Sequence, residues 1–221
     1  MADMNAVEWH YDDPKRQEVV PFIPPTTRKL LDIGCGKGAF GEHLKSLCDI
    51  EVHGFEINPV AAAEAAKRLD QVFHGDLERN PDLIPFQAYD CITLLDVLEH
   101  LQDPWSLLRQ TSKWLQPNGI VVASLPNVRH YPVLKDLLFQ KSFRYGNIGV
   151  LDRTHLRFFT KVSVEELFID CGFHVDSLTG INGEPFPWKW GLLNKLSGGA
   201  LEDTRYLQFV VVGRPAQLAA M

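Results

Sequence analysis

Short apolar runs alternate with segments of helical periodicity along the first half of the chain. KLLDIG (29–34) is an apolar run that ends in glycine, and GAFGEHLKSL (38–47) repeats apolar residues at helical spacing. The same pair recurs at EVHGFEI (51–57) and PVAAAEAAKRL (59–69), where Pro59 suits a first helical position. This alternation predicts strands joined by helical crossovers, which is typical of a parallel sheet.

The pattern continues to residue 126. VFHG (72–75) and DCITLLD (90–96) predict two further strands, and IVVASLP (120–126) predicts a fifth. The segment 103–115 between them predicts a helix that Asp103 caps. Because the fourth and fifth strands are apolar throughout rather than at alternate positions, we expect both faces of the sheet to be covered.

Two irregular segments interrupt the second half of the chain. The segment 127–160 predicts one helix and then a loop rich in arginine, histidine and aromatic residues, and 181–199 is too rich in Pro, Gly and Trp to be regular throughout. Between them, SVEELFIDCG (163–172) predicts a helix with Ser163 and Glu166 in capping-box spacing. Strands are predicted at 173–180 and 205–213, and the second insertion could turn the last strand back antiparallel.

These elements predict one domain over residues 1–213, followed by a flexible tail at 214–221. The fold class is α/β, a doubly wound and mainly parallel seven-stranded sheet with an antiparallel last strand. The chain has 221 residues, of which 45% are hydrophobic and 23% charged, enough for one sizeable core.

The net charge of −6 gives no general attraction to phosphate backbones or anionic lipid. We therefore expect a small-molecule partner and no nucleic acid. The sequence shows no leader and no apolar stretch long enough to span a bilayer, so we expect a cytoplasmic protein without a membrane span. Its four cysteines lie far apart and predict free thiols.

A glycine-rich turn follows the first strand. The residues D-I-G-C-G-K-G-A (32–39) form a G-x-G-x-G turn that also fits a dinucleotide-binding pattern. An unpaired Asp32 beside this turn would repel a pyrophosphate and attract an ammonium or sulfonium group. S-adenosylmethionine (SAM) carries both cations and no phosphate, whereas an NAD-dependent oxidoreductase fits the glycine spacing but not Asp32.

The wording DIGCGKG resembles the first motif of class I SAM-dependent methyltransferases, and the resemblance extends from about residue 28 to 180. It implies a Rossmann-like methyltransferase fold with SAM as cofactor and S-adenosylhomocysteine as product. In such a fold Glu56 would bind the ribose hydroxyls, Asp76 and Leu77 the adenine, and Leu95 and Asp96 the methionine side. The predicted cofactor-binding residues are Asp32, Gly34, Cys35, Gly36, Gly38, Glu56, Ile57, Asp76, Leu77, Leu95 and Asp96.

After the fourth strand, Asp96, Glu99 and His100 lie at the i, i+3 and i+4 spacing of one helical face. The phrase D-V-L-E-H-L resembles small-molecule methyltransferases, including ubiquinone-pathway O-methyltransferases in which a related acid and histidine cluster can hold a divalent metal. We favour an alternative in which Glu99 and His100 brace the loop by hydrogen bonds. Because a few closely spaced ligands do not define a metal site, no metal is predicted.

The first insertion carries a second resemblance. N-V-R-H (127–130) and G-V-L-D-R-T-H-L-R-F-F-T (149–160) are similar to methyltransferases of sugar and surface-polysaccharide pathways. Arginine forks can hold carboxylate, phosphate or sugar hydroxyls, so Arg153 and Arg157 are predicted acceptor clamps. An alcohol acceptor needs a general base, for which the histidines are suited near neutral pH. The candidates for the base, in order of preference, are His155, His100 and His130.

Aromatic residues lie at both ends of this region. Tyr11, within the triplet W-H-Y at 9–11, is predicted to contact the acceptor as part of a lid, and F-P-W-K-W (186–190) predicts either a second lid or a homodimer contact. The function predicted from the resemblance is transfer of a methyl group from SAM to a hydroxyl of a sugar or related polar metabolite. Two alternatives stay open: a quinone, amine or carboxylate acceptor, and a SAM-binding module without catalysis.

Overall fold

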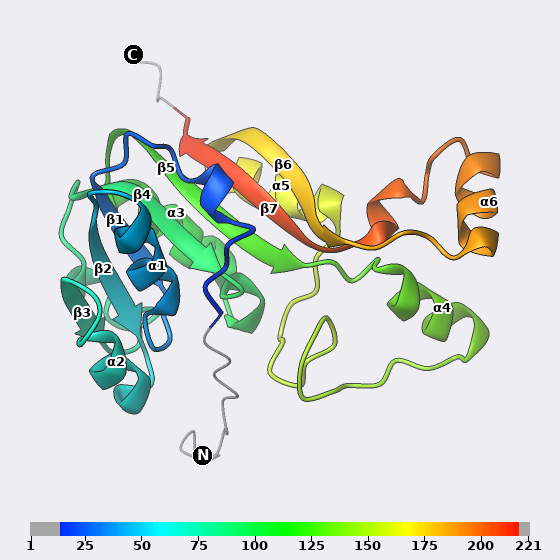
Figure 1. Ribbon diagram of the computed structural model, residues 1–221, viewed down its shortest axis with the longest axis horizontal. Coiled ribbons are helices and arrows are strands. Elements are labelled where there is room, and N and C mark those ends of the chain that lie inside the picture. Colours follow the sequence, from blue (N-terminus) through cyan, green and yellow to red (C-terminus); the bar gives the residue numbers. More distant parts are fainter. Residues whose placement is uncertain (1–13, 217–221) are drawn as a thin grey trace.

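A computed structural model describes residues 14–216, which form a seven-stranded sheet flanked by helices (Figure 1). The strand order is β3-β2-β1-β4-β5-β7-β6. The strands are β1 (Lys29–Ile33), β2 (Glu51–Glu56), β3 (Gln71–His74), β4 (Tyr89–Leu95), β5 (Leu115–Pro126), β6 (Phe173–Gly183) and β7 (Tyr206–Pro215). The α-helices are α1 (Ala39–Leu47), α2 (Pro59–Ala65), α3 (Pro104–Trp114), α4 (Tyr131–Phe139), α5 (Lys161–Asp170) and α6 (Trp188–Leu196). Short 3-10 turns are η2 (Val20–Phe22), η3 (Pro81–Leu83), η4 (Leu98–His100) and η5 (Glu202–Arg205).

The pairing of the strands confirms the predicted fold class. The first five strands pair in parallel, and β7 runs antiparallel to both β5 and β6. The order changes direction at β1, which lies between β2 and β4. In such sheets the crevice beyond the carboxyl ends of the strands is the usual ligand site.

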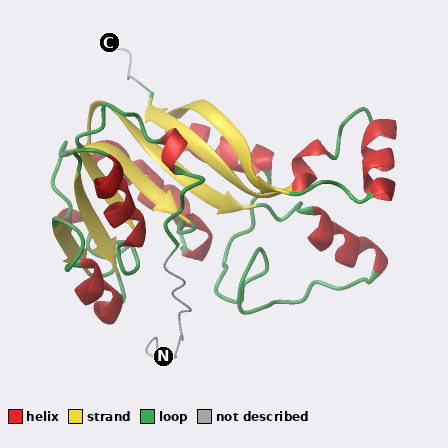
Figure 2. Cartoon of the chain, viewed as in Figure 1, coloured by secondary structure: helices red, strands yellow, loops and turns green. Residues whose placement is uncertain are grey.

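Helices cover both faces of the sheet, as Figure 2 shows. On one face, Phe40 and Leu44 of α1 pack with Leu30 and Val52 from the central strands. On the other face, Leu108 of α3 and residues of α5 join a second apolar cluster with the opposite side chains of the same strands. Burial on both faces explains the continuous apolar character of the central strands.

Two local expectations need correction, and one gains detail. The helix α5 begins at Lys161 because Thr160, rather than Ser163, is its N-cap; Ser163 is the reciprocal partner in the capping box, and Glu166 takes no part. The segment 181–199 is not regular throughout, as expected, but it contains a helix that was not located, α6. The last strand continues two residues past the predicted domain end, where Pro215 pairs with Phe173.

The two insertions form a projection at one end of the sheet, where α4 and α6 lie away from α1 and α2 (Figure 1). Tyr131 joins them, because its ring lies 6.1 Å from that of Trp190 and 6.5 Å from that of Phe186. Trp190 is buried and donates a hydrogen bond from Nε1 to Thr204 Oγ1. We call residues 131–148 and 186–199 the arm. No helix in the described part of the chain is long and apolar enough to cross a membrane.

Candidate functional site

Four acidic residues gather at the carboxyl edge of the parallel strands. Asp32 lies near the end of β1, Glu56 ends β2, Asp76 follows β3 and Asp96 follows β4. Parallel strands end at the same sheet edge, so the topology brings these four predicted cofactor-binding positions to one crevice.

The glycine turn between β1 and α1 has a backbone that side chains disfavour. Gly34, Gly36 and Gly38 have φ angles of +72°, +55° and +86°. A Cβ atom on Gly34 would lie 2.6 Å from Val97 Cγ2, and one on Gly38 would lie 3.2 Å from the Ala65 Cα atom of α2. The turn is therefore packed closely between α2 and the loop after β4. Cys35 within it is buried.

Glu56 ties this turn to the second strand. Its carboxylate accepts a hydrogen bond from the Gly36 amide at 2.9 Å and another from the Asn58 amide at 2.8 Å. Its side chain is only 3% exposed. Ile57 follows immediately and is 44% exposed, which leaves an apolar side chain beside the buried acid. The pairing of Glu56 with backbone amides was not foreseen from the sequence.

Asp32 is more deeply placed than the sequence indicated. It lies within β1, between β2 and β4, and is 3% exposed. The Thr93 hydroxyl donates a 2.7 Å hydrogen bond to Asp32 Oδ1. The expectation of an unpaired carboxyl was therefore wrong. Burial raises the pKa of Asp32 to about 7, although the hydrogen bond from Thr93 opposes this change. Asp32 therefore titrates near neutral pH instead of carrying a full negative charge.

The residues predicted to hold the adenine and methionine parts differ in exposure. Asp76 accepts a hydrogen bond from the Glu78 amide and pairs with the Arg79 guanidinium at 3.1 Å. Leu77 is buried in the apolar cluster, whereas Leu95 is half-buried on the opposite face of the sheet. Their roles toward SAM stay predictions.

Asp96 is the centre of a hydrogen-bond network that includes a residue missed in the sequence. It has a left-handed backbone with φ of +57°, and it accepts hydrogen bonds from Ser124 Oγ and Gln208 Nε2. Arg16 lies 2.7 Å from Asp96 Oδ2 and also donates to Ser124 Oγ. Arg16 thus brings a largely buried guanidinium to the carboxyl edge. Nothing in the spacing of the amino-terminal segment indicated this contact.

A small cavity of about 120 Å³ adjoins Asp96. The loop after β4, the first insertion and β7 all contribute to it. Its volume suits one small group of an acceptor rather than a whole metabolite. The lining residues are Asp96, Glu99, Pro126, Gly149, Val150, His155, Leu207 and Gln208. Leu207 and Gln208 come from the last strand, where no chemical signal in the sequence marked them.

Glu99 is a buried carboxyl group in the wall of this cavity. Its side chain is 1% exposed, and neither carboxylate oxygen has a hydrogen-bond partner among the described residues. Burial, reinforced by the nearby Asp96 carboxylate, raises the pKa of Glu99 well above its ordinary value. The loop is held instead by the Glu99 main-chain oxygen, which accepts from the Leu156 and Arg157 amides. The expected side-chain brace is therefore absent at Glu99.

His155 and His100 lie against Glu99 with their ring centroids 4.7 Å apart. His155 Nδ1 contacts the Val150 carbonyl oxygen at 3.0 Å, and His100 Nδ1 contacts the Thr154 carbonyl oxygen at 3.2 Å. A carbonyl only accepts, so each neutral ring carries its proton on Nδ1 and has a lone pair on Nε2. Burial, together with His155, lowers the pKa of His100.

These three residues form a set of atoms suited to a divalent cation. One atom each from Glu99, His100 and His155 lies within 4.8 Å of the others. A carboxylate without a hydrogen-bond partner and two imidazole lone pairs are ligands that zinc and other first-row metals accept. The chemistry of the set is therefore compatible with a metal, although none was predicted.

The remaining predicted site residues do not line the cavity. His130 precedes α4 with a lowered pKa caused by burial. Arg153 is exposed, and Arg157 donates to the Gln102 carbonyl oxygen while its guanidinium lies 6.0 Å from the Trp105 ring. Tyr11 lies outside the described residues. The roles proposed for these four residues stay predictions.

The crevice fits SAM on its own chemistry. The turn at Gly34–Gly38 permits close approach of a ligand to the backbone, and the acids at the strand ends suit hydroxyl and amino groups. Asp32, at its pKa near 7, can lose its proton to balance a bound cation. Arg16 adds a donor that a carboxylate of the ligand could use.

Comparison with known proteins agrees with this geometry. The sequence profile of the family described as "Methyltransferase domain" matches residues 8–178. A ubiquinone biosynthesis O-methyltransferase of Vibrio atlanticus is 32% identical over 109 residues, covering 45% of this chain and 44% of that protein. One from Psychrobacter arcticus is 26% identical over 200 residues, covering 83% of this chain and 71% of that protein. The chain thus spans between 44% and 71% of the length of these two curated relatives.

A solved structure shares the fold. The crystal structure of a SAM-dependent methyltransferase from Archaeoglobus fulgidus has a TM-score of 0.64 at 18% identity, and the match covers 89% of this chain and 90% of that one. The family profile spans more than half of the chain and includes the glycine turn, the four acids and the cavity-lining His155. The chain therefore belongs to the methyltransferase-domain family, as a class I SAM-dependent methyltransferase with SAM as its cofactor.

Proposed function

We propose that this protein methylates a hydroxyl group of a small polar metabolite, such as a sugar, with His155 as general base. The observation that carries the proposal is the 3.0 Å contact between His155 Nδ1 and the Val150 carbonyl oxygen, from which the tautomer follows because a carbonyl only accepts. The Nδ1 proton of His155 is held by the Val150 carbonyl, which leaves the Nε2 lone pair available in a buried cavity next to the cofactor crevice.

The donor would lie along the carboxyl edge of the sheet. Its adenosyl part would extend from the glycine turn past Glu56 toward Asp76, and its methionine part toward Asp96 and Arg16. In this arrangement the sulfonium methyl faces the cavity that Asp96 and His155 share. The protein would contribute mainly alignment and the exclusion of water, because methyl transfer from a sulfonium is an in-line displacement.

Every bond, electron pair and proton of the proposed methyl transfer is accounted for by the acceptor, SAM and His155. The acceptor oxygen forms a bond to the methyl carbon while the carbon–sulfur bond breaks and its electron pair returns to sulfur. The hydroxyl proton passes to His155 Nε2, and S-adenosylhomocysteine leaves as the neutral thioether. Glu99 Oε1 lies 4.0 Å from His155 Nε2. An ionised Glu99 carboxylate would stabilise the imidazolium that His155 becomes.

Several polar groups support a hydroxylated acceptor. The lining of the cavity includes the polar residues Asp96, Glu99 and Gln208 together with the apolar residues Val150 and Leu207. A mixed lining of this kind would also admit the edge of a phenolic ring, and the curated relatives are named ubiquinone biosynthesis O-methyltransferases. A quinone precursor is therefore the main alternative acceptor, and both acceptors require activation of a hydroxyl.

A second mechanism is favoured by one specific observation, the unpartnered carboxylate of Glu99 beside two histidines. Glu99, His100 and His155 would hold a divalent cation. A bound cation lowers the pKa of a coordinated hydroxyl and so replaces the need for a protein base. Under this alternative His155 binds the metal instead of accepting the proton.

Kinetics of the variant His155→Asn test the proposal. Turnover is measured as S-adenosylhomocysteine released during a screen of sugars, sugar nucleotides and catechols, and SAM affinity is measured by calorimetry. We expect a loss of about 10²- to 10⁴-fold in turnover with SAM affinity retained. His174→Asn is the matched control, because His174 is exposed and lies on β6 outside the cavity.

The outcomes separate the two mechanisms and the non-catalytic alternative. Near-normal turnover by His155→Asn would remove His155 from the chemistry. Loss of wild-type activity on chelation, with recovery on adding a divalent ion, would favour the metal mechanism. SAM binding with no transfer to any acceptor of the screen would favour a SAM-binding module without catalysis.

A further inference from the structure

The two helices of the arm are apolar, yet they bury almost nothing. The sequence of α4 is YPVLKDLLF, and none of its nine residues is buried. The sequence of α6 is WKWGLLNKL, and only Trp190 is buried. A nine-residue helix has little stability in water without packing. Both helices therefore present apolar surface that lacks a partner within the described chain.

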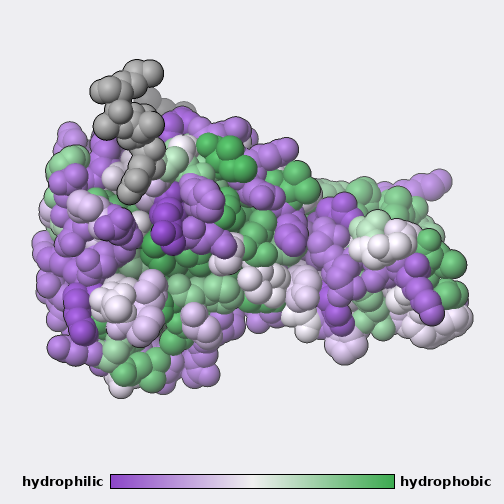
Figure 3. Space-filling view, turned by 90° about the horizontal axis from the view of Figure 1, so that it is seen from above, coloured by the Kyte–Doolittle hydropathy of each residue, from purple (hydrophilic) through white to green (hydrophobic). Residues whose placement is uncertain are grey.

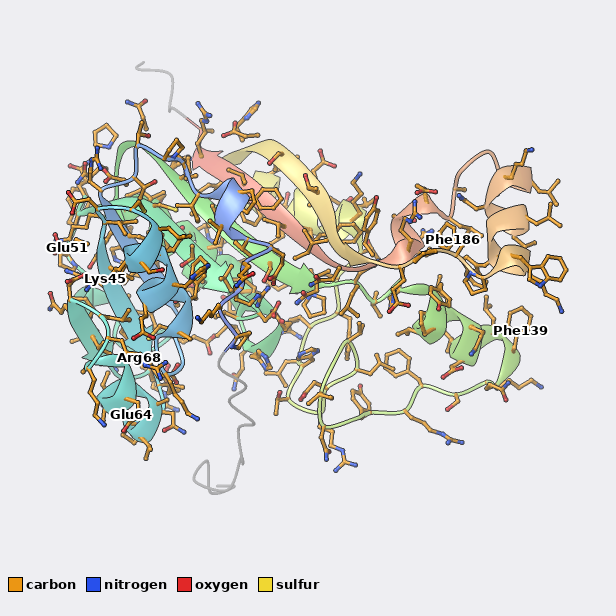
Figure 4. The ribbon with its side chains drawn as sticks, in the orientation of Figure 1. Lys45, Glu51, Glu64, Arg68, Phe139 and Phe186 are labelled. Atoms are coloured by element: carbon orange, nitrogen blue, oxygen red, sulfur yellow. The ribbon has the colours of Figure 1, made fainter. Side chains whose placement is uncertain are left out.

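The exposed side chains at the arm are large. Trp188 and Leu196 of α6 are each 75% exposed, and Leu138 and Phe139 of α4 are 64% and 67% exposed. Figure 4 shows Phe139 at the outer end of α4, and Figure 3 shows hydrophobic surface at the far end of the narrow part of the molecule. Large exposed apolar side chains on two helices that meet through Tyr131 and Trp190 indicate an interaction surface rather than scattered surface residues.

Charge on the arm is opposite to that of the whole chain. The arm carries five basic side chains and one acidic side chain, Asp136, whereas the chain has a net charge of −6. The basic residues are Lys135, Lys141, Arg144, Lys189 and Lys195. The Lys189 ammonium lies 5.5 Å from the centre of the exposed Trp188 ring. Exposed tryptophan beside lysine is typical of side chains that lie at the headgroup level of a bilayer.

We propose that the arm docks on an anionic lipid surface, with the apolar side chains of α4 and α6 entering the interface and the five basic side chains facing lipid phosphates. Such binding is peripheral and needs no membrane-spanning helix. It places the first insertion, which contributes Gly149, Val150 and His155 to the cavity, next to the membrane. The inference rests on the arm alone and is independent of the proposed acceptor.

A second copy of the chain is the competing occupant of the surface. In a two-fold dimer built on the arm, the same five basic side chains of each copy would approach one another. Like charges across an interface oppose association, whereas an anionic bilayer neutralises them. Charge complementarity therefore favours lipid over a second arm.

Co-sedimentation of the full chain with vesicles tests this proposal. Vesicles of phosphatidylcholine alone are compared with vesicles that contain equal amounts of phosphatidylcholine and phosphatidylglycerol. We expect binding to the anionic vesicles, weakened by salt, and little binding to the neutral ones. We also expect Trp188 to move to a less polar environment, so that the blue shift of fluorescence on binding is lost in Trp188→Phe.

Substitutions identify the surface. Leu138→Glu with Leu196→Glu should abolish binding, while Val162→Glu, an equally exposed apolar position on α5, should leave it unchanged. Lys189→Gln with Lys195→Gln should lower the partition coefficient by roughly 10- to 30-fold, since each basic side chain contributes about fivefold near an anionic surface. The control pair Lys67→Gln with Lys161→Gln removes the same charge from the turn after α2 and from the start of α5.

Three results would contradict lipid binding by the arm. Equal loss in the control variants would show that binding follows net charge and not the arm, and would overturn the proposal. No sedimentation with anionic vesicles at low salt would also overturn it. A light-scattering mass of twice 25.0 kDa that Leu138→Glu reduces to one chain, without vesicle binding, would assign the surface to a second copy.

Discussion

Replacing Asp32 with asparagine removes a buried carboxyl group while it keeps the shape of the side chain. Asp32 is 3% exposed and its pKa is raised from 3.8 to about 7, chiefly by burial. Asparagine cannot ionise, but its amide oxygen can still accept the hydrogen bond from Thr93. The variant therefore isolates the consequence of titrating this one group.

The change in the free energy of unfolding follows from the difference between the pKa of Asp32 in the unfolded chain and in the folded protein. A carboxyl with a pKa of 3.8 in the unfolded chain and about 7 in the folded protein binds more protons when folded between these values. The free energy of unfolding thus falls as pH rises from 4 to 7, by about 4 kcal/mol for this group, and the loss is complete above pH 7. Asparagine at this position abolishes that decline.

Urea unfolding at pH values from 4 to 8 measures the effect. We expect Asp32→Asn to gain stability relative to the wild-type protein as pH rises. The difference between their free energies of unfolding should change by about 2 to 4 kcal/mol from pH 4 to pH 8. At the same time its SAM affinity, measured by calorimetry, should be weak and independent of pH. In the wild-type protein the affinity should rise by up to about tenfold per pH unit below pH 7, because the bound cation favours the ionised carboxylate.

Asp90→Asn is the matched control, because Asp90 accepts hydrogen bonds from the Arg28 and Lys29 amides at the amino end of β1, opposite the crevice. It should leave SAM affinity unchanged. Parallel stability curves for the wild-type protein and Asp32→Asn across this pH range would refute the reasoning, since they would show that Asp32 has an ordinary pKa in the folded state.

Three further substitutions test the packing of the crevice and the core by urea unfolding. Gly38→Ala should lose about 1 to 3 kcal/mol more than Gly199→Ala, because both glycines have left-handed backbones but only Gly38 has neighbours within 4 Å of an added Cβ; equal losses would contradict the close packing of the turn on α2. Arg16→Ala should lose about 2 kcal/mol and weaken SAM binding, whereas Lys67→Ala, which breaks an exposed pair, should change neither. Phe168→Ala should lose about 3 to 5 kcal/mol without changing SAM affinity in the folded protein, and a smaller loss would show that the cavity collapses.

The fold and the position of the acids at the strand ends were predictable because they depend on local patterns. Apolar runs that end in acids, such as those at Asp96 and Glu56, mark strands and their carboxyl ends without knowledge of the tertiary structure. The reasoning at Asp32 was only partly correct. The sequence placed an acid beside the glycine turn, but burial between β2 and β4 and the hydrogen bond from Thr93 depend on strand pairing, which the spacing does not reveal.

The candidate acceptor site was less predictable because it joins distant segments. Arg16 contacts Asp96 across 80 positions in the sequence, and Gln208 reaches it from the last strand. The basic character of the arm was also missed, since its charges are divided between two insertions and hidden in a negative total. His155 was named as a candidate because its motif is compact, and it does line the cavity, yet its tautomer depends on the Val150 carbonyl in the folded loop.

Diffraction from crystals grown with SAM would test the central claim most directly. We predict density for the adenosyl group along the glycine turn and past Glu56 toward Asp76, with the sulfonium methyl pointing to the cavity that Glu99 and His155 line. A crevice that stays empty at saturating SAM, or that binds a nicotinamide dinucleotide in its place, would contradict the account.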